Sequence, residues 1–212
     1  MPPLSAAERP AVLAELRARI AAPRSLGGRL SAELPELEAW FGGWPCPGVS
    51  EIVGAPGSGR LGVVLPALAA LTRRGRPVLV VDAMEEVYPP GWAGPGGGVE
   101  LSQLWIVRPG LDRAAWVAEQ AAAAGSVEAV VLLDAPRLGR HAVRLGRACE
   151  RGGTALFVVA EESEAELPAA VRLQVRGQKG GRVAVSCTKS RDGRHLGERR
   201  VRLMSVGGRL SS

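Results

Sequence analysis

The sequence predicts an α/β fold in which a mostly parallel sheet is flanked by helices and continues into an antiparallel meander at the C-terminus. Two patterns predict this class. Between residues 49 and 160, short apolar segments alternate with segments of helical length, which is typical of a parallel sheet covered on both faces. From residue 171 onward, apolar and polar residues alternate one by one, which is typical of strands with one face in solvent.

Each element of the core follows from its apolar pattern. We expect parallel strands at residues 49–53, 77–82, 104–107, 127–134 and 154–160, with helices that include 59–74, 113–124 and 136–151. Gly-containing turns separate the three segments that alternate in period two. We therefore expect the strands of the meander at 171–176, 182–187 and 198–204.

The N-terminal segment 5–22 predicts an amphipathic helix, because Leu13, Leu16 and Ile20 recur at helical spacing. Such an apolar face has two interpretations. It docks on a partner protein, or it packs on the core of its own chain. We regard the segment as a helical arm and its three apolar side chains as a candidate partner surface.

The length of 212 residues is that of one domain with a substantial core. A segment rich in Gly and Pro at residues 42–48 predicts a join between the arm and the rest of the chain. We therefore divide the chain into an N-terminal helical arm with its linker, residues 1–45, and a core, residues 46–212, which includes the meander at 171–212.

Composition excludes several classes. With 46% hydrophobic and 23% charged residues, the chain is neither disordered nor fibrous. Its apolar stretches are too short for a membrane span, and its start lacks the pattern of a secretory signal. Cys46, Cys149 and Cys187 are scattered without metal-ligand spacing, so we interpret them as core residues and expect neither a metal nor a disulfide framework. We expect a cytoplasmic protein.

The positive charge is concentrated at the C-terminus. Residues 171–212 contain nine Arg and two Lys against two carboxylates, whereas the preceding residues have a balance of −3. In the predicted meander, Arg172, Arg176, Arg182, Arg200 and Arg202 share one solvent face. This pattern favours contact with a polyanion, although solubility alone explains part of it. The candidate residues for contact with DNA or an acidic partner are Arg172, Arg176, Arg182, Lys189, Arg191, Arg200 and Arg202.

A second basic stripe lies on the predicted helix 136–151. Its arginines are spaced by three, four, three and four residues, which places them on one helical face. This stripe either binds phosphates or an acidic partner, or it is a solvated face. Its members are Arg137, Arg140, Arg144, Arg147 and Arg151.

The segment from Ser50 to Leu61 has the strand, glycine loop and helix of a phosphate-binding P-loop. Its two chemical positions are altered. Arg60 replaces the usual Lys, and Leu61 replaces the Ser or Thr whose hydroxyl holds magnesium. Asp134 closes an apolar strand, where related sites keep a carboxylate for the magnesium shell. The candidate nucleotide-binding residues are Gly54, Gly57, Gly59, Arg60 and Asp134.

The same residues have a structural interpretation, which we favour. In it, the glycines form only a tight turn between strand and helix, and Asp134 caps the helix that begins at Pro136. We therefore expect no enzymatic activity, and no cofactor, with ATP and magnesium as the alternative. Asp82 ends an earlier strand and is followed by Glu85 and Glu86, which are candidate water-activating carboxylates.

Several phrases of the chain resemble the core of RecA-type recombinases, and more closely the ImuA family of RecA-like accessory proteins in bacterial translesion DNA synthesis. The matching segments are Glu51-Ile52-Val53-Gly54 with the altered P-loop that follows it, residues 78–82, residues 87–92, residues 104–109, and residues 144–153, which lead into the strand at 155–159. Their order and spacing cover about residues 48–203. The resemblance implies a RecA-like core.

The resemblance also implies partners. These are a protein similar to Y-family polymerases, an error-prone polymerase of the replicative type and the RecA recombinase, under DNA-damage control. The basic meander, and not the resemblance, adds single-stranded DNA to this list. Some residues depart from the recombinase pattern. Met84 stands where recombinases have the water-activating carboxylate, four Glu occupy residues 161–166 in place of a DNA-holding loop, and Lys189 is what remains of a cationic pair.

We therefore expect a non-catalytic RecA-like accessory factor of translesion synthesis, with no membrane contact. Two alternatives stay open. One is a DNA-stimulated ATPase of the recombinase class that tolerates Arg60 and Leu61. The other is a cell-division inhibitor with a RecA-like fold.

Overall fold

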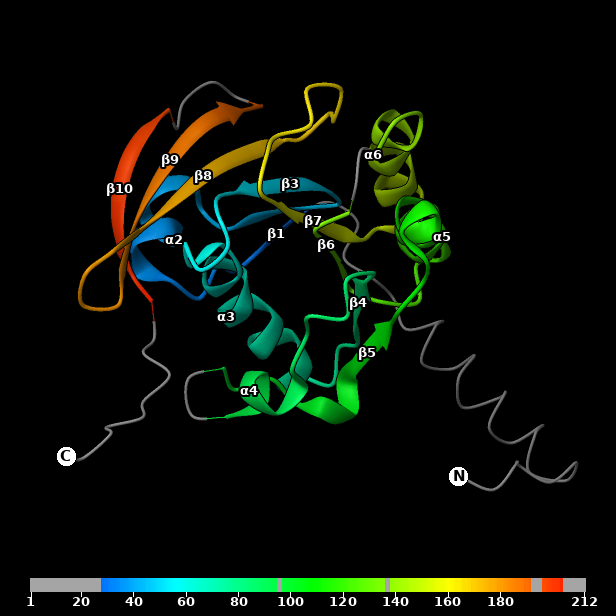
Figure 1. The fold of residues 1–212 in the computed structure, drawn as a ribbon, viewed down its shortest axis with the longest axis horizontal. Coiled ribbons are helices and arrows are strands. Elements are labelled where there is room, and N and C mark those ends of the chain that lie inside the picture. Colours follow the sequence, from blue (N-terminus) through cyan, green and yellow to red (C-terminus); the bar gives the residue numbers. More distant parts are fainter. Residues whose placement is uncertain (1–27, 95–96, 136–137, 192–195, 204–212) are drawn as a thin grey trace, which may run out of the picture.

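A computed structural model describes residues 28–94, 97–135, 138–191 and 196–203. An eight-stranded sheet forms its centre, with strand order β10-β9-β8-β3-β7-β6-β4-β5 (Figure 1). Each neighbouring pair from β8 to β5 is parallel, and β9 and β10 are antiparallel. The strands are β3 (Gly48–Val53), β4 (Val78–Asp82), β5 (Leu104–Val107), β6 (Ala129–Leu133), β7 (Ala155–Ala160), β8 (Val171–Gln178), β9 (Arg182–Ser190) and β10 (Gly197–Arg202).

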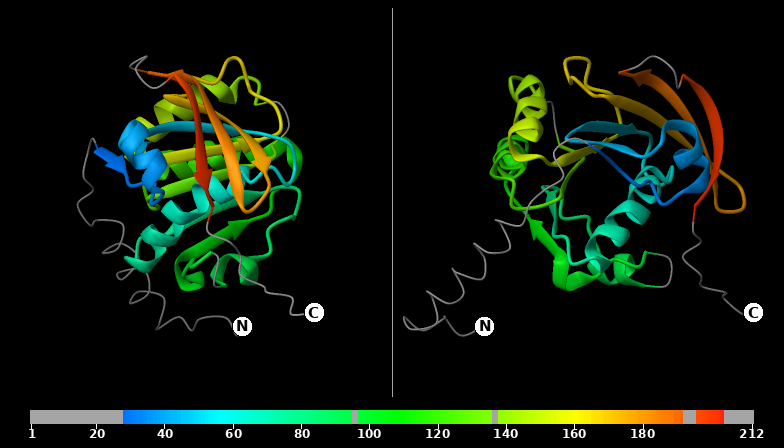
Figure 2. Two further views of the ribbon diagram at one scale, coloured as in Figure 1. Left: turned by 90° about the vertical axis from the view of Figure 1, so that its left-hand side faces the viewer. Right: turned by 180° about the vertical axis from the view of Figure 1, so that it is seen from behind.

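This arrangement confirms the predicted α/β class, the mostly parallel sheet and the C-terminal meander. Helices cover both faces of the sheet (Figures 1 and 2). On one face lie α2 (Pro35–Phe41), α3 (Arg60–Arg73) and α4 (Pro89–Ala93), and on the other lie α5 (Ala114–Ala124) and α6 (His141–Gly152). Two short 3-10 helices, η1 (Leu101–Gln103) and η2 (Leu111–Arg113), precede β5 and α5. Among the described helices, none has the length and apolar character to cross a membrane.

Helix α6 begins at His141, five residues after the predicted start at residue 136. Gly139 adopts a left-handed conformation with φ of 51°, which breaks the helical path just before this point. The N-cap of α6 is Arg140. The interpretation of Asp134 as the cap of this helix is therefore wrong. Arg137 lies outside the described residues.

Residues 28–46 form part of the packed core. Strand β1 (Gly28–Leu30) pairs antiparallel with β2 (Trp44–Cys46), and α2 lies between them in the chain. Trp44 is fully buried, and its ring meets that of Phe157 on β7 edge to face, with centroids 5.3 Å apart. The predicted division at residues 45 and 46 therefore does not separate two packed units.

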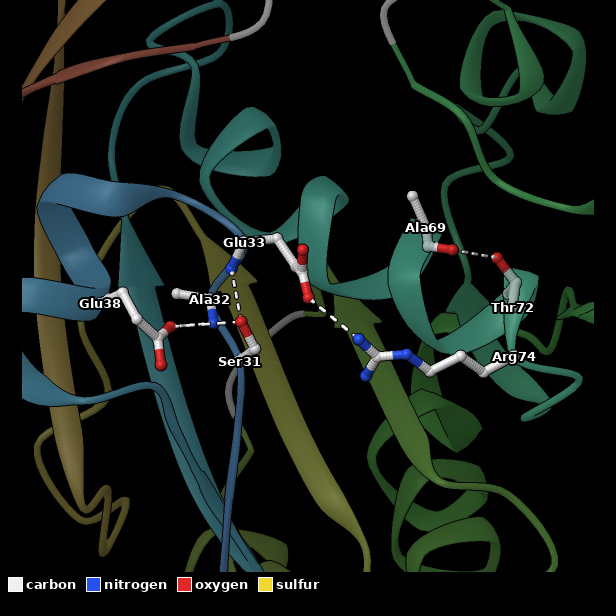
Figure 3. Close-up of polar contacts among 7 residues, drawn as sticks. All are labelled: Ser31, Ala32, Glu33, Glu38, Ala69, Thr72 and Arg74. Carbon is white, nitrogen blue, oxygen red and sulfur yellow. Dashed lines mark hydrogen bonds and ion pairs between the residues drawn. The ribbon is translucent and has the colours of Figure 1, made fainter.

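Polar contacts also tie this segment to α3 (Figure 3). The carboxylate of Glu38 accepts the Ala32 N–H at 2.7 Å, which fixes the turn before α2. Arg74, just after α3, forms an ion pair with Glu33 at 3.5 Å. The predicted helix at residues 5–22, with Leu13, Leu16 and Ile20, lies outside the described residues.

The register of the meander assigns its side chains to two faces. Val175 lies opposite Val185, and Val183 opposite Val201, and all four are buried on the side of α2 and α3. The alternating polar side chains lie on the other face, which is the side of α5 and α6. Because those two helices pack over the parallel strands, they leave this face of β8, β9 and β10 uncovered (Figure 2, left). The predicted alternation is confirmed.

Candidate functional site

The glycine loop joins β3 to α3 at the carboxyl edge of the parallel strands. A methyl group on Gly54 would lie 2.5 Å from the carbonyl oxygen of Val175, and one on Gly59 would lie 2.7 Å from Val183 Cγ1. Gly59 also has φ of 88°, which side chains rarely adopt. At both positions glycine is required because β8 and β9 pack closely on the loop. Gly57, with φ of 74°, is exposed and has space around it.

Arg60 is the first residue of α3, and its guanidinium turns back into the protein. It donates to Asp134 Oδ2 at 2.6 Å and to the carbonyl oxygen of Gly54 at 2.9 Å. Arg60 is 8% exposed. The structure thus brings the predicted residues Gly54, Arg60 and Asp134 together, but they bind one another. In a P-loop that binds nucleotide, the cation at the position of Arg60 would bind a phosphate, and the carboxylate at the position of Asp134 would help to hold magnesium. Here the two side chains neutralise each other.

Asp134 lies in an environment that disfavours its charge. Burial is the main factor that raises the pKa of this carboxyl above its ordinary value, and the nearby carboxylates of Glu86 and Glu161 raise it further. Arg60 acts in the opposite direction, through its charge and its hydrogen bond. The pKa remains raised overall. The ion pair with Arg60 therefore opposes the rise in pKa that burial and the neighbouring carboxylates cause.

A cleft of about 670 Å³ opens above this ion pair and is strongly acidic. Arg60 is the one basic residue among the lining residues that the structure describes. A smaller cavity of about 350 Å³ shares Arg60 and Asp134 and has apolar walls from Leu61, Val87, Trp92 and Leu133. The carboxylates that line the larger cleft are Glu51, Glu86, Asp134, Glu161, Glu162 and Glu164.

This set of groups does not fit a nucleoside triphosphate. Several carboxylates would face the phosphates, and the guanidinium of Arg60 is already bound. Leu61 supplies no hydroxyl for a magnesium ion. Within the described residues, no group of three or more His, Cys, Asp or Glu side chains could hold a metal ion.

The other candidate carboxylates lie at the end of β4 and in the turn that follows it. Asp82 is 1% exposed and accepts the N–H groups of Glu86 at 2.9 Å and Val87 at 3.1 Å. Its Oδ2 also meets Arg108 Nε at 3.4 Å. Asp82 thus holds the turn that follows β4. Glu86 lines the acidic cleft, and Glu85 is exposed with φ of 57°.

A fully buried carboxylate, Glu51 on β3, was not singled out from the sequence as a candidate. It forms an ion pair with Arg172 on the neighbouring strand β8 and accepts the N–H of Glu164 at 2.6 Å. Arg172 also donates to the Glu164 carbonyl oxygen at 2.7 Å. The charge of Arg172 is therefore compensated inside the protein. One signal was available, because Glu51 interrupts an otherwise uncharged strand.

Four of the predicted contact arginines lie together on the uncovered face of the meander. Arg182 and Arg202 are directly opposite each other on β9 and β10. In the next row of paired residues across the three strands, Arg176 on β8 and Arg200 on β10 lie on either side of Ala184 on β9. All four are exposed. Glu198 is the carboxylate of the following row, where it accepts from Arg176 at 2.6 Å and from Ser186 at 2.9 Å.

The remaining predicted contact residues lie elsewhere. Lys189 is half-buried and sits opposite Arg172, beside an irregularity in the β8 and β9 pairing. Arg191 is exposed and lines a separate cavity of about 390 Å³ with Glu150 and Arg29. The structure thus brings four of the seven candidates onto one open surface.

The three cysteines are buried, which agrees with their interpretation as core residues. Burial raises the pKa of the Cys149 thiol to about 12. This thiol therefore stays protonated at neutral pH and is a poor nucleophile.

Comparison of the chain with models of known protein families and with curated proteins finds no match.

Proposed function

We propose that the chain is a non-catalytic, RecA-like accessory protein that binds a polyanion through the open face of its meander. The observation that carries this proposal is the group of four exposed arginines on β8, β9 and β10. No helix of the described residues covers them, and Glu198 is the carboxylate that compensates part of their charge. We name single-stranded DNA as the polyanion and an acidic protein segment as the alternative.

The state of the glycine loop supports the non-catalytic part of the proposal. Hydrolysis of a nucleotide needs a free cation and a bound metal at the transferred phosphoryl group. Here Arg60 is held by Asp134 and Gly54, and the carboxylates of the cleft repel phosphates. The loop thus serves to pack α3 against β8 and β9.

The biological setting of the proposal comes from the resemblance to the ImuA family. In that setting the protein acts in DNA-damage-induced translesion synthesis in the cytoplasm. Its partners are a protein similar to Y-family polymerases, an error-prone polymerase of the replicative type and the RecA recombinase. The mostly parallel sheet with its antiparallel meander and the altered P-loop support this part of the proposal.

Fluorescence anisotropy with a labelled single-stranded oligonucleotide tests the proposal. We expect binding that weakens with salt and does not depend on ATP and magnesium. The double variant Arg182→Gln, Arg202→Gln should reduce the slope of log affinity against log salt by about 1.4, or roughly 0.7 per lost contact. The charge-matched control is Arg73→Gln, Arg74→Gln at the exposed end of α3.

Two results would overturn the proposal. Binding that requires ATP would favour the ATPase alternative. An equal loss of affinity in the α3 control would show that net charge, and not the meander face, carries the interaction. Co-purification with a translesion polymerase partner tests the biological setting separately.

A further inference from the structure

Helix α6 carries a row of arginines on its outer surface that is separate from the meander. Arg140, Arg144, Arg147 and Arg151 are all exposed. Arg144 lies 3.8 Å from the carboxylate of Glu119 on α5, and among the described residues the other three have no carboxylate within 4 Å. From the helical rise, the row is roughly 16 Å long. It is thus a line of mostly uncompensated positive charge.

This row is unfavourable for the isolated helix. Arginines three or four residues apart repel one another, and they replace the pairs of mixed sign that stabilise most exposed helices. Arg140 also lies at the N-terminus of α6, where the helix dipole disfavours a cation. A bound anion would relieve both effects. The row therefore has the charge pattern of a binding surface.

A half-exposed tryptophan lies on the neighbouring helix α5. Helices α5 and α6 pack side by side, and a side chain on Gly152 would collide with the backbone of Ala122. Glu119 links the two helices through His141, at 2.7 Å, and through Arg144. Trp116 lies one turn before Glu119 on α5 and is 50% exposed. It therefore lies about one helical turn from the residue that contacts the N-terminal part of the arginine row.

We propose that this α5 and α6 surface binds single-stranded nucleic acid, with phosphates along the arginine row and a base stacked on Trp116. Arginines that follow a strand and an aromatic ring that stacks on bases are the two components of such sites. An acidic protein segment would match the charge but would make no use of an exposed indole ring as a stacking platform. The proposal does not rest on the function proposed for the meander, because the two surfaces share no residue.

Tryptophan fluorescence provides a readout specific to this surface. Trp40, Trp44 and Trp92 are buried, whereas Trp105 and Trp116 are exposed. We expect a twelve-residue oligo(dT) to quench the fluorescence of the full chain. The quenching should disappear in Trp116→Phe and persist in Trp105→Phe. Anisotropy should show that Trp116→Ala binds this oligonucleotide about tenfold more weakly.

The arginine row is tested with Arg140→Gln, Arg147→Gln, which removes two cations that have no carboxylate partner in the described structure. This variant should require roughly tenfold more oligo(dT) for half-maximal quenching. The control Arg73→Gln, Arg74→Gln carries the same change of charge on α3 and should behave as the wild type. Arg182→Gln, Arg202→Gln should retain the quenching of Trp116, which separates this site from the meander.

Quenching that survives Trp116→Phe would overturn the proposal. So would quenching that is weakened equally by Arg140→Gln, Arg147→Gln and by the control Arg73→Gln, Arg74→Gln. Poly-glutamate is the competing probe. If it quenches Trp116 at the same concentration of charges as oligo(dT), the surface takes acidic protein segments and the nucleic-acid assignment is wrong. Circular dichroism of each variant shows whether the fold is kept, and a loss of quenching in a folded variant supports the proposal.

Discussion

Arginines lie both around the acidic cleft and on the open face of the meander, but their charges are compensated inside the protein only around the cleft. There, Arg60 forms an ion pair with Asp134, and Arg172 forms one with Glu51, so each positive charge has a partner inside the protein. On the open face, Arg182 and Arg202 lie directly opposite each other with no carboxylate between them. An arginine is thus available to a ligand only where the fold leaves its charge uncompensated.

The largest effect in this comparison is expected for Glu51→Gln. Glu51 is fully buried, and its loss leaves the half-buried Arg172 without a counter-charge. Removal of one partner of a buried pair costs about 3 kcal/mol of unfolding free energy. Urea denaturation of the variant measures this change.

The control for this prediction is Arg176→Ala on the open face. Arg176 pairs with Glu198 in solvent, so the urea midpoint should stay close to that of the wild type. The double variant Glu51→Leu, Arg172→Leu should recover much of the stability lost in Glu51→Gln, because it removes both charges. Equal losses in Glu51→Gln and Arg176→Ala would contradict the distinction between the two regions.

The second largest effect is expected for Arg60→Ala, which leaves Asp134 without its partner. We expect a loss of about 2 kcal/mol at pH 7, less than for a fully buried pair because Asp134 is partly exposed. The loss depends on pH. A carboxyl whose folded-state pKa is raised favours the folded state below its unfolded pKa, and this contribution disappears as pH rises through the folded pKa.

Without Arg60, the pKa of Asp134 should rise further, because Arg60 is the group that lowers it. The difference in stability between the wild type and Arg60→Ala should therefore grow as pH increases from about 4. Urea midpoints measured from pH 4 to 7 check this, and Asp134→Asn should remove the dependence. A difference that shrinks with rising pH would rule out this account of the pair.

The fold could be predicted from the sequence wherever a local pattern determines it. The strand at 104–107 was predicted with the bounds of β5, because an apolar run between polar residues marks it clearly. The start of α6 was missed because Gly139 breaks the helix inside an apparently continuous pattern. Residues 1–45 were predicted as an arm with its linker, separate from the core. The packing of the described part of this segment was missed because it depends on the aromatic side chains of α2 and β2, which have no regular spacing.

The candidate site was predicted less completely, since its interactions join distant parts of the chain. The position of the glycine loop follows from a local motif. Arg60 and Asp134 are 74 residues apart, and Glu51 and Arg172 are 121 apart, so no local pattern shows that they neutralise each other. Period-two alternation correctly placed Arg182 and Arg202 on one face, because it depends only on strand geometry.

A smaller effect is expected where an arginine lies on the covered side of the meander. Arg199 on β10 lies over the ring of Trp40 on α2, with its guanidinium carbon 5.2 Å from the ring centroid. Arg199→Ala should lower the unfolding free energy by about 0.7 kcal/mol through loss of this cation–π contact. Denaturant titration measures the change, and Trp40→Leu in the same background should make the arginine substitution neutral.

The smallest change in stability, and the one of opposite sign, is expected for Arg182→Gln. Like charges directly opposite on neighbouring strands destabilise a sheet, so removal of one should raise the unfolding free energy by about 0.3 kcal/mol. The same substitution should weaken binding of single-stranded DNA and lower its salt slope by about 0.7. High salt should abolish the gain in stability, because it screens the repulsion between exposed charges. A variant that loses both stability and DNA binding would show that Arg182 supports the fold. A gain in stability together with a loss of binding would show that Arg182 contributes to ligand binding at a cost in stability.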